Sequence, residues 1–222
     1  MASPALPDQF VHRHNHSDFS LLDGAMKTKQ MAQRAADLGQ PALALTDHGN
    51  MFGAVEFYKN CKAVGVKPII GMEAYVTRDH TDRTADKRNK SYHMILLAKN
   101  ETGYRNLVRL SSYGYLDGFY YRPRIDRGLL DTYSEGIIGL SACMSGEPNF
   151  HLRSGNLEAD IEAASAYRDI LGKDNYYLEI QNHGIEEEAR IRQLMPEVAK
   201  ATGCPIIATN DCPFLDRDHH EA

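Results

Sequence analysis

The chain has 222 residues, a net charge of −5, 42% hydrophobic residues and 25% charged residues. This composition is typical of a globular protein with enough apolar residues for a core, and the negative charge argues against a surface that wraps nucleic acid along its length. No apolar run approaches the roughly 18 residues of a membrane span, and the four cysteines form no CxxC pair, so we expect a cytoplasmic protein with reduced thiols and no membrane partner.

Short apolar runs alternate with longer amphipathic stretches along the chain. Strands are predicted at residues 10–14, 42–46, 67–77, 92–98, 136–141, 176–181 and 205–209. Helices are predicted at residues 26–38, 54–64, 101–115, 157–171 and 186–202, and Gly65 and Gly203 stand where C-terminal caps belong. This alternation predicts an α/β fold, either an open doubly wound sheet or a closed barrel.

Eight side chains of metal-ligand type stand where the predicted strands run out. They are His14, His16, Asp23, His48, Glu73, His93, Cys143 and Asp211. A barrel of parallel strands gathers its strand ends on one rim, whereas the outermost strands of an open sheet lie too far apart to share a metal cluster. The pattern therefore predicts a closed seven-stranded barrel with a multinuclear metal centre. Imidazole, carboxylate and thiolate suit zinc, manganese or iron.

The local spacing supports this prediction. His14 and His16 are two residues apart, so on a strand they face the same side, and His12 shares that parity as an added ligand or a rim residue. The two oxygens of Glu73 suit it to bridge two ions, and a metal would hold Cys143 as a thiolate. Any one of these residues alone is more often a surface histidine or a small core residue, so the prediction depends on their recurrence.

A site with two or three adjacent cations indicates a class of reaction. The cations polarise a phosphoryl group, generate hydroxide and stabilise the leaving oxygen, which makes phosphoester hydrolysis the natural chemistry of the site. The sequence has no glycine-rich phosphate loop and no recognisable Ser-His-Asp order that would indicate a different mechanism.

Four segments carry a resemblance to a known family. They read HNHSDFSLLDGA, ALTDHGNMFGAVEFYKNCKAVGVKPIIGMEAYV, LDGFYYRPRID and YLEIQNHG. They resemble the N-terminal polymerase and histidinol phosphatase (PHP) domain of bacterial replicative DNA polymerase III alpha subunits. The resemblance implies a distorted (β/α)7 barrel over residues 1–222, as one domain at the N-terminus of a longer polymerase chain. It also implies up to three Zn²⁺ or Mn²⁺ ions, with Fe as a further candidate, held at the eight positions above.

The resemblance also implies an activity and partners. Members with the full ligand set are similar to metal-dependent phosphoesterases, and some act as 3′–5′ proofreading exonucleases on a DNA primer 3′ end. Asp47 and Arg122 are the candidate catalytic residues, with Arg122 steering the phosphate. The expected partners are the remainder of the polymerase chain, a separate proofreading subunit and, through the parent protein, a sliding clamp.

One position departs from the family pattern, which ends Asp-x-His. Here the sequence reads Asp211-Cys212-Pro213, and proline offers no side-chain donor. Cys212 should point to the opposite face of a strand, so the sequence offers no ready substitute, although His219 or His220 could fold back. Two alternatives to an exonuclease therefore stay open: a catalytically degenerate scaffold that holds fewer ions, or a small-molecule phosphatase of the histidinol-phosphate type, against which the polymerase-like motifs argue.

A second candidate site spans residues 113–124, which are dense in aromatic and basic side chains. Such a stretch could stack the bases and pair with the phosphates of a single strand. Equally, the tyrosines could pack beneath a loop while the arginines meet acidic neighbours such as Asp117 and Asp126.

Overall fold

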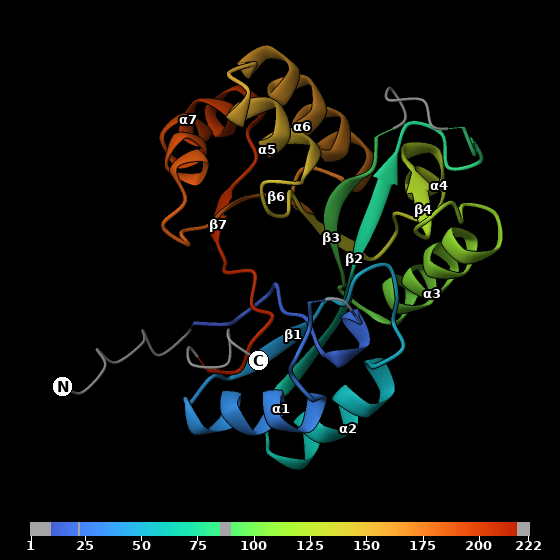
Figure 1. The fold of residues 1–222 in the computed structure, drawn as a ribbon, viewed down its shortest axis with the longest axis vertical. Coiled ribbons are helices and arrows are strands. Elements are labelled where there is room, and N and C mark those ends of the chain that lie inside the picture. The colour runs from blue at the N-terminus through green and yellow to red at the C-terminus, as the bar shows by residue number, and fades with distance from the viewer. Residues whose placement is uncertain (1–9, 22, 85–89, 217–222) are drawn as a thin grey trace.

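The strands form one curled sheet in the computed structural model, which describes residues 10–21, 23–84 and 90–216 (Figure 1). In chain order they are β1 (Ala42–Leu45), β2 (Lys67–Thr77), β3 (Tyr92–Ala98), β4 (Arg124–Asp126), β5 (Ile137–Leu140), β6 (Tyr176–Ile180) and β7 (Ile206–Ala208). Across the sheet the order is β1-β2-β3-β5-β6-β7, and β4 pairs with the end of β2. This curled α/β sheet is the distorted barrel wall that the sequence predicted.

One strand departs from the expected parallel arrangement. β3 runs antiparallel to both β2 and β5, whereas the other pairs are parallel. The connection from β2 to β3 contains no helix among its described residues, and a chain that returns without a crossover helix pairs antiparallel. His93 therefore stands near the start of its strand. Glu73 lies in the middle of β2, so the expectation that all eight residues stand where strands run out is wrong at both positions.

The N-terminal segment joins the two edges of the sheet. Residues 10–14 were expected to form a regular strand, but they form none, and the residues that follow make only isolated bridges, between Asn15 and Cys212 and between Ser17 and Met26. On one side the backbone N–H groups of Ala44 and Thr46 donate to this segment, and on the other the N–H of His16 donates to Cys212 at 3.1 Å. The segment thus closes the barrel between β1 and the chain that follows β7.

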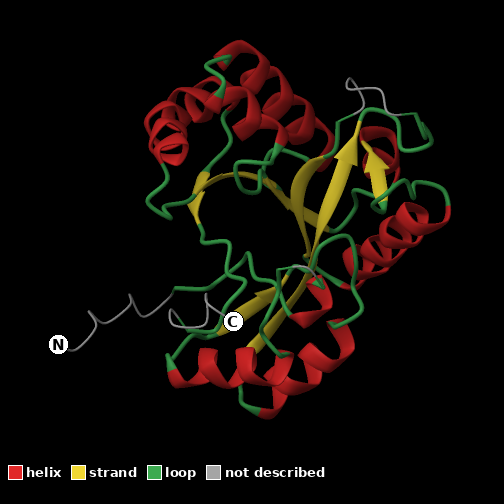
Figure 2. Ribbon diagram, in the orientation of Figure 1, coloured by secondary structure: helices red, strands yellow, loops and turns green. Residues whose placement is uncertain are grey.

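Helices cover the outside of the curled sheet (Figure 2). They are α1 (Thr28–Asp37), α2 (Ala54–Ala63), α3 (Glu101–Leu116), α4 (Arg127–Thr132), α5 (Glu147–Arg153), α6 (Leu157–Leu171) and α7 (Glu186–Thr202), and a single 3-10 turn, η1, spans Asp18–Ser20. In Figure 1, α1 and α2 lie against β1, and α5, α6 and α7 gather beside β6 and β7. None of the described helices is both long and apolar enough to cross a membrane.

Local signals set the ends of these helices. The side chain of Asn100 accepts a hydrogen bond from the N–H of Gly103 at 3.0 Å and so caps the start of α3. Gly203 adopts a φ of 71° at the end of α7, a conformation that L residues with side chains rarely take, which confirms the predicted cap.

Small and branched apolar side chains fill the inside of the barrel. Ala44, Ile95, Leu97, Leu140 and Ala142 form one buried cluster contributed by β1, β3 and β5 and the turn after β5. Ile95 is in register with Glu73 of β2, and paired residues on neighbouring strands share a face. The apolar cluster therefore supports the site that Glu73 occupies.

Candidate metal centre

Glu73 lies at the middle of the predicted site, and its side chain is fully buried. Its Oε1 lies 2.8 Å from Nδ1 of His93 and 3.5 Å from Nε2 of His14. Its Oε2 contacts Nδ1 of His48 and lies 3.7 Å from Nε2 of His16. One carboxylate thus contacts four histidines from three separate segments of the chain.

These donors fall into two groups that share Glu73. His14, His16 and Glu73, here called the inner group, present ligand atoms that all lie within 4.8 Å of one another. His48, Glu73 and His93, here called the outer group, do the same. The arrangement offers two adjacent positions for metal ions, and Glu73 belongs to both.

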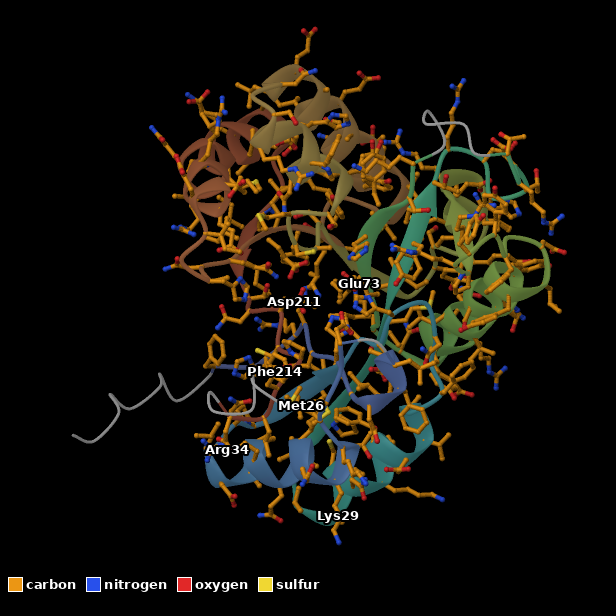
Figure 3. All side chains as sticks on the ribbon, viewed as in Figure 1. Met26, Lys29, Arg34, Glu73, Asp211 and Phe214 are labelled. Atoms are coloured by element: carbon orange, nitrogen blue, oxygen red, sulfur yellow. The ribbon has the colours of Figure 1, made fainter. Side chains whose placement is uncertain are left out.

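The remaining three predicted ligands border these groups. Oδ1 of Asp211 lies 3.2 Å from Nε2 of His16 in the inner group, and Figure 3 places Asp211 and Glu73 near the centre of the molecule. In the outer group, Nε2 of His48 donates to Asp23 at 2.8 Å, and Sγ of Cys143 lies 3.8 Å from Nδ1 of His93. The structure therefore brings all eight predicted residues together.

Buried polar residues that the sequence reasoning missed orient the inner histidines. Nδ1 of His14 donates to Oε1 of Glu179 at 3.2 Å, and Thr209 donates to the same oxygen at 2.6 Å. A carboxylate behind a histidine fixes the ring and leaves Nε2 free for a metal. Glu179 stands in the motif YLEIQNHG, where a lone acidic residue in an apolar strand was the available signal.

Asp47, a candidate catalytic residue, lies behind the site. Its carboxylate accepts hydrogen bonds from the N–H of Ser17 at 2.7 Å and from the hydroxyls of Ser17 and Ser20, each at 2.8 Å. Ser20 in turn accepts from Nδ1 of His16 at 3.2 Å and from the N–H of His48 at 3.1 Å. This geometry favours a positioning role for Asp47 over contact with a substrate.

Opposite charges shift the pKa values within the inner group. Burial alone would lower the pKa of His14, but the carboxylates of Asp211 and Glu179 hold that pKa well above its usual range. Burial alone would raise the pKa of Glu73, but His93 and His14 hold it well below its ordinary value. The carboxylates that stabilise a proton on His14 would equally stabilise a bound cation.

Charged neighbours also shift the pKa values of residues in and beside the outer group. Burial opposes protonation of His48, yet its contact with Glu73 and the charge of Asp23 raise the pKa of His48 to about 9. Burial and the charge of Glu73 raise the pKa of the Cys143 thiol to about 12, so Cys143 needs a cation to become a thiolate.

The residues present fit a metal centre. Four buried atoms of the two donor groups lack a partner in hydrogen-bond geometry among the described residues, although each lies at ion-pair distance from another polar atom: Nε2 of His14, Nε2 of His16, Nδ1 of His48 and Oε2 of Glu73. A metal ion would satisfy nitrogen and oxygen donors that converge in this way.

The ninth position of the family pattern carries no donor here. Cys212 points away from the centre, because its Sγ lies 3.7 Å from Nδ1 of His12 and it packs against the apolar cluster beneath α1. His12 therefore neighbours Cys212 and is not within the two donor groups. The carbonyl of Pro213 accepts a hydrogen bond from the N–H of Ala25 at 3.0 Å. His219 and His220 lie outside the described residues.

The two arginines of the aromatic and basic stretch, residues 113–124, differ in role: one is structural and the other is exposed beside the candidate site. Arg124 is buried and donates to the backbone carbonyls of Gly118, His80 and Asp82, so it is structural. Arg122 is exposed, and its Cζ lies 4.9 Å from the ring centroid of Tyr75, beside the metal centre.

Comparisons with known proteins identify the family of this chain. A family model described as the PHP domain matches residues 12–183. DNA polymerase III subunit alpha of Treponema pallidum is 47% identical over 213 residues, which cover 94% of this chain and 18% of that protein. The corresponding subunit of Mycobacterium tuberculosis is 42% identical over 240 residues, covering 100% of this chain and 20% of the relative. The chain thus spans about a fifth of the length of these relatives.

Two solved structures share the fold at low sequence identity. One, from Bifidobacterium adolescentis and assigned as a metal-dependent phosphoesterase, has a TM-score of 0.57 and 17% identity, covering 94% of this chain and 89% of the other. The other, an amidohydrolase from Chromobacterium violaceum with bound sulfate and no metal, has a TM-score of 0.53 and 12% identity, covering 91% and 87%. The fold, the matched motifs and the relatives agree, and the chain belongs to the PHP domain family.

Proposed function

We propose that this chain is the PHP domain of a DNA polymerase III alpha subunit and that its metal centre hydrolyses the terminal phosphodiester of a DNA 3′ end. The observation that carries the proposal is the convergence of seven other donor side chains around Glu73, with four buried donor atoms that lack a partner in hydrogen-bond geometry among the described residues. The similarity to alpha subunits of several bacteria supports the polymerase context.

Each donor group would hold one cation, and Glu73 would bridge them. When bound, such cations polarise the phosphoryl group of a substrate and activate a water molecule. Asp211 would complete the inner position, whereas Asp23 and Cys143 would complete the outer one. The candidate ions are Zn²⁺ and Mn²⁺, with Fe as a further candidate, because the set combines imidazole, carboxylate and thiol.

The other residues have separate tasks. Arg122 is exposed beside the centre and would pair with the non-bridging oxygens of the phosphate, a geometry for which a guanidinium is suited. Asp47 would act through Ser17 and Ser20, which fix the turn that carries His16.

The test compares the protein with its Pro213→His variant. Both are loaded in turn with Zn²⁺, Mn²⁺ or Fe²⁺, metal content is measured by elemental analysis, and release of the terminal nucleotide from a labelled primer is followed. We expect at least two ions per chain in both and nucleotide release that the histidine increases. A labelled 3′ end that stays intact with every metal in both proteins would contradict the proposal.

Pro213 favours a second candidate, a scaffold without catalysis. In that role the domain would support the polymerase chain, or a separate proofreading subunit and sliding clamp would act alongside it. Metal content well below two ions that Pro213→His restores, with a melting temperature unaffected by chelator, would support the scaffold. Turnover of small phosphate esters but not of DNA would instead indicate a phosphatase of the histidinol-phosphate type.

A further inference from the structure

A cavity of about 600 Å³ lies directly over the metal centre. Asp23, His48, His93, Cys143 and Asp211 contribute to its lining, so its floor is the metal site. This volume is within the range of roughly 300–1,000 Å³ that small-ligand sites occupy, and it exceeds what a phosphate group alone requires. The cavity therefore has room for the part of a substrate next to the phosphate.

Aromatic side chains line another part of this cavity. Phe52, Tyr115 and Tyr121, here called the aromatic rim, all contribute to its wall. Phe52 is 64% exposed and Tyr121 is 84% exposed, although both are large rings beside a polar site. The rings of Phe52 and Tyr115 contact each other with centroids 5.7 Å apart. Exposed apolar surface gathered at a cavity indicates a surface that a ligand covers.

The backbone of Tyr121 adds an independent observation. Its φ of 59° is in the left-handed region, which tyrosine rarely adopts and which asparagine and glycine tolerate better. A bridge between its neighbours Tyr120 and Arg122 holds this conformation, with the N–H of Tyr120 donating to the carbonyl of Arg122 at 3.1 Å. Strained residues persist where the surrounding structure imposes them, and they concentrate at functional sites.

We propose that the aromatic rim is a base-stacking subsite that receives the terminal nucleobase of a single strand while Arg122 and the metal centre receive its phosphate. This inference rests on the proposed function, because it assigns the organic part of that substrate. Rings stack on every base, so the subsite would select a nucleotide end that is unpaired without selecting its sequence. Arg122 follows Tyr121 directly, which places the phosphate-binding and base-binding groups on one short segment.

The test uses a single-stranded oligonucleotide with 2-aminopurine at its 3′ end and a terminal phosphorothioate that slows hydrolysis. The fluorescence of 2-aminopurine changes when the base stacks on a ring. We expect Tyr121→Asn, which suits the left-handed backbone, to weaken binding about 10-fold and to remove the fluorescence change. Tyr121→Phe should retain both. Tyr58→Asn is the matched control, because Tyr58 is an exposed tyrosine of α2 that does not line this cavity.

The outcomes separate this inference from the proposed function. If Tyr121→Asn and Phe52→Leu both bind like the original protein, or if an oligonucleotide with an abasic 3′ end binds equally well, the stacking subsite is wrong, even where the phosphodiester is hydrolysed. If the rim variants lose binding and fluorescence change while no metal supports hydrolysis, the subsite stands and the hydrolytic function fails. If the protein does not bind the oligonucleotide, both are overturned.

Discussion

The inner and outer donor groups of the metal centre differ in how firmly the fold holds them. His14, His16 and Glu73 are buried, and Glu179 and Ser20 fix the two histidines from behind. By contrast, the side chains of His48 and His93 are each 16% exposed, and Asp23, which contacts His48, is 51% exposed. The inner position is therefore buried and held by hydrogen bonds from behind, whereas the outer one includes side chains that solvent reaches.

This difference links metal binding to the fold. The segment that carries His14 and His16 also joins β1 to the chain after β7. An ion in the inner position would hold that segment to Glu73 and Asp211 as well, because a ligand that binds only the folded state stabilises it. An ion in the outer position would not hold this segment, so its loss should cost activity with a smaller cost in stability.

The largest effect should follow Glu73→Gln, because this residue belongs to both groups. The substitution keeps the size of the side chain but removes the charge that both positions share. We expect metal content to fall toward zero, and activity to fall by more than the roughly 10–100-fold that changes behind a ligand cause. Elemental analysis and nucleotide release would measure this.

Glu73→Gln needs a control for folding, because buried histidines lose their carboxylate partner. Circular dichroism and a thermal melt of the metal-free proteins would show whether the variant still folds. A folded Glu73→Gln protein that keeps two ions per chain would show that the groups are independent, which would remove the bridging role.

Glu179→Gln and Asp23→Asn should separate the two positions. Glu179→Gln removes the charge behind His14, and we expect inner-site affinity to fall about 10–100-fold and chelator to lower the melting temperature at lower concentration. Asp23→Asn should weaken only the outer ion and lower the melting temperature less than Glu179→Gln does. Competition with a coloured chelator would count the ions lost. The contrast between inner and outer groups would be wrong if both variants lost the same ion.

Some of this molecule could be predicted from the sequence, and the reasons are specific. β2, β3, α6 and α7 have the predicted bounds because long periodic segments carry strong signals, and all eight ligand-type residues converge. The short elements β4, α4 and α5 were missed, since a few residues show no period. Glu179 was missed as well, because its role depends on a contact with His14, which lies 165 positions earlier in the chain.

Glu73, inside the metal centre, and Asp160, outside it, are both buried carboxylates, but their surroundings differ. Glu73 is surrounded by histidines, which hold its pKa well below the ordinary value. Asp160 of α6 is equally buried, but neither of its oxygens has a hydrogen-bond partner among the described residues, and burial raises its pKa from 3.8 to about 7. The low pKa of Glu73 keeps it ionised and available to a cation, whereas the raised pKa of Asp160 keeps that carboxyl protonated up to about pH 7.

The smallest effect on the metal centre, and a clear effect on stability, should follow Asp160→Asn. Between pH 4 and pH 7 the folded state keeps the proton on Asp160 and the unfolded state loses it, so the free energy of unfolding falls as pH rises and is level above pH 7. Asp160→Asn should match the original protein near pH 4 and exceed it by about 4 kcal/mol at pH 8. Urea unfolding at both pH values would measure this difference, with Glu162→Gln on the exposed face of the same helix as the control. An equal gain at both pH values would mean that packing, and not the charge of Asp160, causes it.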